Sequence, residues 1–593
     1  MAQTVADQIL QRLHEWGVRH IFGYPGDGIN GIIGSFAELD DAPRFVQARH
    51  EEMAAFEATG YAKFSGEVGV CLATSGPGAI HLLNGLYDAK LDHVPVVAIV
   101  GQTARTAMGG NYQQEVDLNT LFKDVAHHYV HTAMVPEQFP MLIDRAIRTA
   151  YAERCPTCII VPSDLQDLRW DPPTHDFKMV PGSLGWTPPD AVPASSDLQR
   201  AAAVLNAGER VAVLVGQGAR GARDQVIDVA DRLGAGVAKA LLGMDVLSDD
   251  LPYVTGAIGL LGTKPSYDLM MECDTLLMVG SSFPYSQFLP PFGQARGVQI
   301  DLDGTMIGIR YPMEVNLVGD AAATLSALVP LLEAKADRAW REGIESAVAR
   351  WCEVLDAQAH QDANPINPQR LVWELSSRIP HDAIVSSDSG SAANWYARHL
   401  RFRGDMRGSL SGTLATMGPG VPYAIGAKFA HPGRPAIALV GDGAMQMNGI
   451  NELITIKRYW QEWTDTRLIV AVLHNNDLNQ VTWEQRAMSG DPKFEGSQTL
   501  PDFPYADYAM SLGLDGKVVD DPGALGDTWE RALASDRPFV IDAICDPEVP
   551  PLPPHVELEQ ATSLLKAVMK GDPASAEIVR NGFRGKLEEL LHR

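Results

Sequence analysis

The sequence predicts an α/β protein built from three doubly wound, parallel-sheet domains. Short apolar runs alternate with helical patterns along all 593 residues, and this alternation is typical of parallel α/β layers. The chain is also too long for one domain, and three domains of ordinary size fit its length.

Changes in composition divide the chain into blocks. We expect an N-terminal domain at 1–175, with strands in HIFGYPG, VGVCLATSGPG and VPVVAIVGQ. A Pro-rich stretch then predicts a linker. A central domain at 193–335, a third domain at 366–550 and a helical tail at 551–593 follow. The first and third blocks each place a glycine-rich turn, SGPG or GPG, before a helix of small residues, which suggests related folds.

Composition limits the kinds of partner. The net charge of −26 argues against a nucleic-acid partner. The six scattered cysteines suit a reducing compartment, so we expect a cytoplasmic protein. For the lone pair Cys155 and Cys158, two packed thiols are favoured over a metal or redox site. The N-terminal residues show no signal peptide, and no apolar run reaches membrane-spanning length.

Polar residues follow two predicted strands of the third block. Asp442 comes after AIALV within the sequence GDG, and Asn476 comes after LIVAVL and His474. If these strands are neighbours, both side-chain oxygens lie at one sheet edge, where Mg²⁺ and substrate phosphates bind in such folds. Gly441, Gly443 and Ala444 would let phosphate approach the start of a helix. A tight turn with a capping asparagine pair is the alternative, which explains GDG alone but not both motifs.

GDG followed by an asparagine pair resembles the thiamine-diphosphate-dependent decarboxylase superfamily. The resemblance implies that Asp442, Asn476 and the carbonyl of Leu478 bind magnesium. The two motifs are separated by 31 residues here, more than the family has. The surplus lies around WQEWTDT, and an insertion in a surface loop is inexpensive.

The run ARHEEMAAFEATGYAKFSG carries the second part of the resemblance. In the family, RHE before an alanine-rich helix supplies the glutamate that keeps the aminopyrimidine nitrogen of the cofactor protonated, which points to Glu51 and not to Glu52. A carboxyl group in an apolar pocket suits this role because burial raises its pKa. An ordinary helix start with exposed acids is the alternative. The family places this glutamate and the metal site on different subunits, so a homo-oligomer, either dimer or tetramer, is implied.

The resemblance assigns further cofactor-facing positions. In the family, the carbonyl at Ala415 accepts the 4′-amino group, Met417 supports the bent cofactor, and Gln114 faces the reacting carbon. Relatives often have Phe where this chain has Gln113, which changes the acceptor pocket. The remaining positions implied in this way are Gly26, Asp27, Gly76 and Ser391.

The middle block resembles the FAD-binding domain of pyruvate oxidases and acetohydroxyacid synthases. VLVGQGA supplies a strand with a GxG turn but lacks the full dinucleotide fingerprint. Asp301 and Asp303 in IDLD would end a strand and accept from ribose or adenine. A structural domain with an empty cleft is the alternative. The resemblance implies FAD and cofactor-binding positions at Gly216, Gly218, Ser281, Phe283, Asp301 and Asp320.

The closest resemblance within the family is to quinone-linked bacterial pyruvate oxidases. It implies decarboxylation of a small 2-keto acid, pyruvate, with electron transfer to FAD and then to quinone or oxygen. The ending VELEQATSLLKAVMKGD resembles a tail that contacts membrane lipid, which implies a peripheral membrane contact. A docking helix is the alternative for the apolar face formed by Phe583, Leu587, Leu590 and Leu591.

Three alternative functions stay open. In the first, an acetolactate synthase joins two 2-keto acids and FAD has no redox role. WEQR at 483–486 resembles the WEDR of those synthases, Gln480 and Val481 replace the oxidases' Gly-Phe pair, and both segments are expected to shape the acceptor pocket. However, the synthases' RFDDR segment is missing. A nicotinamide-dependent dehydrogenase and a non-catalytic, nucleotide-holding protein are the others, and neither explains the GDG and asparagine motifs.

Overall fold

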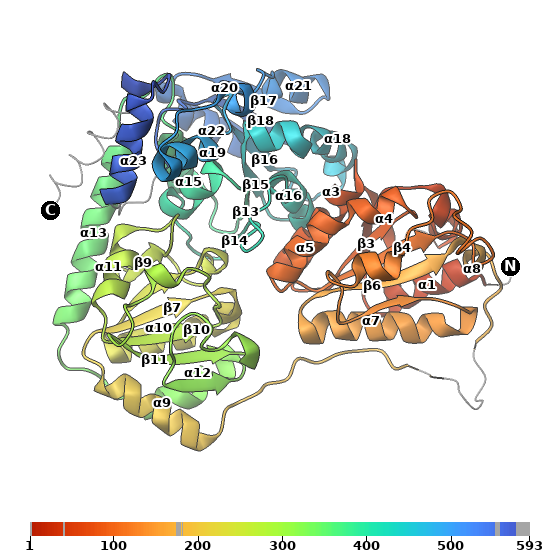
Figure 1. Cartoon of the computed structure of the whole chain (residues 1–593), viewed down its shortest axis with the longest axis horizontal. Helices are drawn as coiled ribbons and strands as arrows, with labels where there is room; N and C mark the ends of the chain where they lie inside the picture. The colour runs from red at the N-terminus through yellow and green to blue at the C-terminus, as the bar shows by residue number, and fades with distance from the viewer. Residues whose placement is uncertain (1–2, 40–41, 173–179, 181, 552–557, 577–593) are drawn as a thin grey trace.

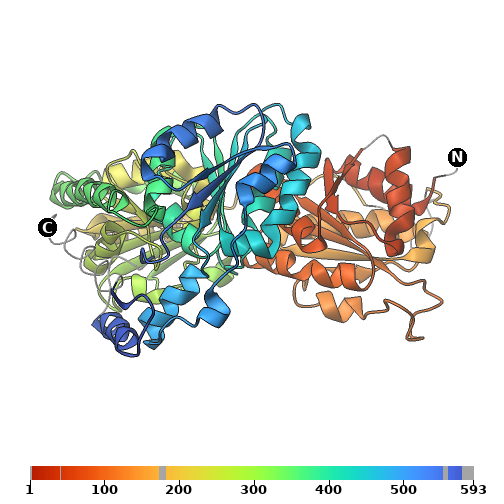
Figure 2. The same ribbon diagram turned by 90° about the horizontal axis from the view of Figure 1, so that it is seen from above.

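The computed structural model describes residues 3–39, 42–172, 180, 182–551 and 558–576. It contains three six-stranded sheets in which all the paired strands run parallel, so the predicted fold class is confirmed. Figure 1 shows the first, middle and third sheets with their helices, and Figure 2 shows that the third lies between the other two. All three sheets fall inside the predicted domain ranges, whose limits stay predictions.

The first sheet has the order β2-β1-β3-β4-β6-β5. Apolar side chains of α1 and α7 cover one face, and those of α3 and α5 cover the other. Its strands are β1 (His20–Gly23), β2 (Arg44–Gln47), β3 (Gly69–Ala73), β4 (Val96–Gln102), β5 (Val130–Thr132) and β6 (Pro156–Pro162). Its helices are α1 (Val5–Glu15), α2 (Asn30–Glu38), α3 (Glu51–Ser65), α4 (Pro77–His81), α5 (Leu83–Leu91), α6 (Leu118–Phe122), α7 (Phe139–Glu153) and α8 (Ser163–Gln166).

The third sheet repeats the strand order of the first sheet, as β14-β13-β15-β16-β18-β17. This agrees with the expectation of related folds. Its strands are β13 (Ile384–Ser387), β14 (Arg407–Ser409), β15 (Ala436–Gly441), β16 (Leu468–His474), β17 (Asp515–Val519) and β18 (Phe539–Ile544). Its helices are α14 (Pro368–Arg378), α15 (Ser391–His399), α16 (Gly420–Ala430), α17 (Asp442–Ala444), α18 (Ile450–Tyr459), α19 (Asn479–Glu484), α20 (Glu495–Gln498), α21 (Tyr505–Ser511), α22 (Leu525–Leu533) and α23 (Leu558–Met569).

The middle sheet has a different order, β12-β11-β10-β7-β8-β9. The order reverses between β10 and β7, which makes a crevice at the carboxyl ends of those two strands. Its strands are β7 (Val211–Val215), β8 (Gly236–Lys239), β9 (Val254–Ala257), β10 (Thr275–Val279), β11 (Arg296–Asp301) and β12 (Val315–Val318). Its helices are α9 (Ser195–Ala207), α10 (Arg223–Leu233), α11 (Lys264–Glu272) and α12 (Ala321–Leu328), and α13 (Ala339–Ala359) leads to the third sheet.

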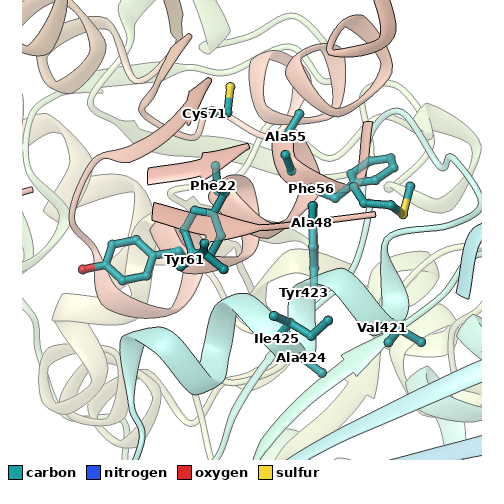
Figure 3. Packing of buried hydrophobic residues seen from close by; sticks show 14 of the residues in the cluster. Phe22, Ala48, Ala55, Phe56, Tyr61, Cys71, Val421, Tyr423, Ala424 and Ile425 are labelled. Carbon is teal, nitrogen blue, oxygen red and sulfur yellow. The ribbon is translucent and has the colours of Figure 1, made fainter. Parts of the chain in front are cut away.

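The first and third domains pack through α3 and α16, as Figure 3 shows. The helices approach closely because small residues face each other. A Cβ added at Gly60 would lie 2.7 Å from the Cα of Tyr423, and one added at Gly426 would lie 2.4 Å from the carbonyl oxygen of Glu57. This packing explains the alanine- and glycine-rich sequence of α3, which is buried almost all round.

The insertion around WQEWTDT is not a simple surface loop. Within WQEWTDT, Trp463 is buried and packs against Phe429, so this insertion adds to the core.

Cys155 and Cys158 are both buried and free, and burial raises the pKa of Cys155 to about 12. Within the described residues, none of the helices combines the length and apolar character that crossing a membrane requires. The predicted apolar tail face lies in 577–593, outside the described residues.

A fully buried carboxyl pair lies between α3 and α18. Burial and the neighbouring charge of Glu452 raise the pKa of Glu57 well above its ordinary value of 4.5. Burial also raises the pKa of Glu452, although the backbone N–H of Arg49 donates to its carboxyl group. The folded protein therefore holds protons that the unfolded chain releases, so the free energy of unfolding falls as pH rises above about 4.5.

We expect Glu57→Gln to raise the melting temperature at pH 8, because glutamine stays neutral in the buried site. The difference from the unsubstituted protein should shrink towards pH 5. Thermal unfolding across this pH range is the measurement, and Glu137→Gln at an exposed position is the control. Equal melting temperatures of Glu57→Gln and the unsubstituted protein at pH 8 would contradict the argument.

Candidate cofactor-binding site

The GDG and asparagine motifs meet at one edge of the third sheet. β15 and β16 are hydrogen-bonded neighbours, with Gly441 opposite Leu473, so the residues after each strand come together. The Asp442 carboxylate accepts the N–H of Gly443 at 2.9 Å, the N–H of Asn475 at 2.8 Å and the N–H of Asn476. The side chain of one motif thus fixes the backbone of the other.

The Asp442 carboxyl group is a buried acid held by backbone donors. The residue is 2% exposed. Burial raises its pKa to about 6, while the N–H groups of Asn475 and Asn476 act in the opposite direction. Backbone N–H groups carry only partial positive charges. A divalent cation at this position would supply the full positive charge that balances the buried carboxylate. The donor set therefore fits a hard metal ion.

The other two predicted metal ligands, Leu478 and Asn476, differ in whether they reach the cavity. Leu478 lines the same cavity as Asp442, with a carbonyl oxygen that accepts the N–H of Thr482 and has a second lone pair. Asn476 is outside the cavity lining, and its amide oxygen lies 2.9 Å from Nε2 of His474. Asn476 has a φ of 53°, in the left-handed region. Such backbone strain is concentrated at functional sites.

The loop before α16 forms a second wall. Ala415 has a φ of 54° and lines the cavity together with Met417. Asp388 accepts the N–H groups of Gly418 at 2.9 Å and Gly420 at 2.8 Å, which fixes the loop to the end of β13. The helix α15 begins at Ser391 in the same wall, and its N–H groups can bind an anion.

One cavity of about 1420 Å³ connects this edge with the middle domain. It is larger than the roughly 300–1,000 Å³ of an ordinary ligand site, so two cofactors can fit end to end. First-domain residues, including His93 and Arg154, close one side of it. The predicted site residues that line it are Gly216, Gly218, Ser281, Phe283, Asp301, Asp320, Ser391, Ala415, Met417, Gly441, Asp442, Gly443, Ala444 and Leu478.

The middle-domain part of the cavity is the crevice where the strand order reverses. Gly216 follows β7 and Ser281 follows β10, and a Cβ at Gly216 would lie 2.3 Å from the carbonyl oxygen of Gly280. Asp301 ends β11, and its carboxylate accepts the N–H of Asp303 at 2.9 Å. This is the place where open α/β sheets bind nucleotides.

The five site residues predicted in the first domain lie elsewhere. Glu51 begins α3 and is 7% exposed, and its carboxylate lies 2.9 Å from Nδ1 of His81. The Gln114 amide oxygen accepts the hydroxyl of Ser75 at 2.9 Å, and a Cβ at Gly76 would lie 2.8 Å from the Cβ of Gln114. The structure gathers Gly26, Asp27, Glu51, Gly76 and Gln114 at the carboxyl edge of the first sheet, and none of them lines the cavity.

Only one residue of the WEQR segment, Glu484, lines the cavity. Trp483 is 2% exposed and Arg486 is fully buried. Both nitrogens Nε and Nη2 of Arg486 donate to Asp572 at 2.9 Å, so this side chain fastens the segment after α23 to the loop. Of the residues at 480–486, it is Gln480, Val481 and Glu484 that line the cavity.

Comparison with known proteins identifies all three domains. Residues 3–121 match the thiamine pyrophosphate enzyme N-terminal TPP binding domain, 198–328 its central domain, and 388–543 its C-terminal TPP binding domain. The chain is 36% identical to the "Putative thiamine pyrophosphate-containing protein YdaP" of Bacillus subtilis, over 96% of each chain.

Two named enzymes are similar at equal identity. The pyruvate oxidase of Lactiplantibacillus plantarum is 30% identical over 94% of this chain and 90% of its own. The acetolactate synthase large subunit of Parasynechococcus marenigrum is 30% identical over 95% of this chain and 93% of its own. The chain therefore belongs to the thiamine pyrophosphate enzymes, in the family of pyruvate oxidases and acetolactate synthases, as the sequence motifs predict.

Proposed function

We propose that the protein decarboxylates a small 2-keto acid such as pyruvate and transfers the electrons to FAD, and from there to a quinone or oxygen. The single observation that carries this proposal is the continuous cavity. It reaches from the Asp442 turn of the third domain to the Gly216 crevice of the middle domain, so a cofactor in one part can touch a cofactor in the other.

In the third domain, Asp442, Asn476 and the carbonyl of Leu478 would hold Mg²⁺ against the diphosphate. Two features support this assignment, namely the buried Asp442 carboxylate, which accepts three backbone N–H groups, and the start of α15 at Ser391. When bound, thiamine diphosphate supplies the electron sink for loss of carbon dioxide. The wall formed by Ala415 and Met417 would orient it.

In the first domain, Glu51 would keep a proton on the aminopyrimidine ring of the cofactor. Within one chain, Glu51 is outside the cavity that contains Asp442, so a second copy must bring its first domain to that cavity. Exposed apolar side chains at the Glu51 edge support such an interface, with Tyr24 at 38%, Ile80 at 43% and Tyr112 at 62% exposed. We therefore propose a homodimer or a tetramer built from such dimers.

In the middle domain, FAD would occupy the crevice between β7 and β10. The close approach of backbone at Gly216 and the acid Asp301 at the end of β11 support a nucleotide with a ribose. Asp320 lines the same cavity and accepts the N–H of Ala323 as the N-cap of α12. Its carboxylate could also accept a hydroxyl of the nucleotide.

Acetolactate synthesis is the second candidate, because the pyruvate oxidase and the acetolactate synthase are equally similar to this chain. In that reaction a second 2-keto acid replaces the electron acceptor. Gln480 and Glu484 line the cavity near the third-domain site. These polar side chains could bind the second keto acid by hydrogen bonds.

The purified protein should show a flavin absorption spectrum. With thiamine diphosphate, Mg²⁺ and pyruvate, it should release carbon dioxide and reduce an artificial electron-accepting dye. Acetolactate formation without dye reduction would instead establish the synthase. A colourless protein that releases carbon dioxide would contradict the FAD assignment and leave the decarboxylase. The same assay with other 2-keto acids would identify the substrate side chain.

A further inference from the structure

A buried ion pair in the first domain holds a loop of the third domain. Asp92 follows α5, and its two carboxylate oxygens accept the N–H groups of Thr413 at 2.8 Å and Gly412 at 2.9 Å. Lys63 donates to the same carboxylate at 2.7 Å and to the carbonyl oxygen of Leu410 at 2.7 Å. The side chains of Lys63 and Asp92 are 2% and 0% exposed.

The loop held in this way leads directly to the cofactor wall. Gly412, Thr413, Ala415 and Met417 all line the cavity. Ala415 has its left-handed φ of 54° only two residues after Thr413. A non-glycine residue keeps this conformation only where its surroundings impose it. The contacts from Asp92 are therefore part of what fixes the carbonyl of Ala415.

Asp92 also connects this loop to the middle domain. Its own carbonyl oxygen accepts Nε2 of Gln217 at 2.8 Å, and Gln217 lines the nucleotide part of the cavity. A Cβ at Gly412 would lie 2.5 Å from Cγ of Leu242 in the middle domain. All three domains thus meet at Asp92, beside the junction of the two proposed cofactor sites.

Stability alone does not account for this arrangement. Apolar residues of similar volume are often as stabilising as a buried ion pair. An apolar side chain at position 92, however, would leave two adjacent N–H groups without an acceptor. The carboxylate is the group that fixes the backbone of Gly412 and Thr413, and Lys63 is its charged partner at 2.7 Å.

We infer that Lys63 and Asp92 are positioning residues for thiamine diphosphate, acting through the loop from Leu410 to Met417. This inference rests on the proposed function, because it presumes that the loop contacts the cofactor. Neither residue lines the cavity, so their effect on affinity is indirect.

The test is the dissociation constant of thiamine diphosphate in saturating Mg²⁺, measured by calorimetry on the full chain. We expect Asp92→Asn to raise this constant about tenfold or more, because one charged hydrogen-bond acceptor for the loop is lost. Lys63→Met keeps the acceptor and should raise the constant by a smaller factor, about threefold. The Michaelis constant for thiamine diphosphate should rise in parallel, with kcat at saturating cofactor changed less.

The matched control is Asp144→Asn. Asp144 is about as buried as Asp92, pairs with Arg12 at 2.8 Å, lies in the first domain and is not among the residues that line the cavity. It should lower the melting temperature as Asp92→Asn does, yet leave the dissociation constant within about twofold of the unsubstituted value. This comparison separates a loss of stability from a loss of cofactor positioning.

Each outcome decides a different claim. Failure of the unsubstituted protein to bind thiamine diphosphate would overturn the proposed function. Binding that is normal in the unsubstituted protein and equally normal in Asp92→Asn and Lys63→Met would overturn only the present inference. If Asp92→Asn does not fold, Lys63→Met alone decides, and an unchanged dissociation constant in that variant overturns the inference.

Discussion

Replacing Glu51 with glutamine should reduce turnover of pyruvate at least about 100-fold, because general acid–base groups contribute roughly 10²–10⁴-fold to a rate. Glutamine fills the same space at the start of α3, but it cannot share a proton with the aminopyrimidine ring. The dissociation constant of thiamine diphosphate should change only a few fold, since Glu51 is not one of the proposed diphosphate or metal ligands. Carbon dioxide release and equilibrium binding are the two measurements.

The neighbouring acid provides the control. Glu52 accepts the side-chain amide of Asn84 at 2.6 Å, and Asn84 in turn donates to Thr416 at 3.0 Å. Glu52→Gln should therefore keep turnover within about threefold of the unsubstituted protein, because glutamine can still accept this hydrogen bond. Full activity in Glu51→Gln, or loss of activity confined to Glu52→Gln, would refute the assignment.

Replacing Asp442 with asparagine should weaken Mg²⁺-dependent binding of thiamine diphosphate at least about 100-fold. Loss of a residue that only supports a metal ligand costs about 10–100-fold, and a direct anionic ligand should cost more. Asparagine also lacks the charge that attracts the ion, and it presents an amide group where three backbone N–H groups need an acceptor. Calorimetric titration at several Mg²⁺ concentrations is the measurement.

A nearby surface acid tests whether the effect is local charge alone. The Asp502 side chain is 79% exposed and lies 3.1 Å from Nε2 of His474, the same nitrogen that contacts Asn476. Asp502→Asn removes a negative charge close to the proposed metal site without touching the ligand set. Its cofactor affinity should match that of the unsubstituted protein within about twofold. Normal Mg²⁺-dependent affinity in Asp442→Asn would remove the basis of the metal assignment.

The sequence allowed the fold and one half of the site to be predicted for a physical reason. Buried parallel strands are short apolar runs, so their ends can be recognised, and residues after neighbouring strands must meet at one sheet edge. This reasoning placed Asp442 beside the asparagine pair. Gly216 and Ser281 came from the family resemblance, and the structure brings them together in the crevice of the middle sheet.

Other features depend on contacts that have no local pattern. Asp92 and the loop at Gly412 are 320 positions apart, and nothing in either segment indicates the other. The burial of Arg486 likewise depends on Asp572, which lies in the tail segment. The Asn476 amide also turns towards His474, a rotamer that sequence spacing cannot specify. Ion pairs between distant segments and side-chain rotamers are therefore the features that the sequence could not predict.

The close packing of α3 against α16 limits how the domains can be exchanged, whether by engineering or by recombination in evolution. Because Gly60 and Gly426 leave no room for larger side chains, the first and third domains must be altered as a matched set. The middle domain is also fastened to the third by polar contacts, in which Arg407 donates to Asp245 and the backbone N–H of Phe402 donates to Asp249. A replacement for the middle domain must therefore keep these acceptors. Chimeras that replace the middle domain but keep the acceptors Asp245 and Asp249 should express in soluble form, whereas hybrids that combine first and third domains from different relatives should not.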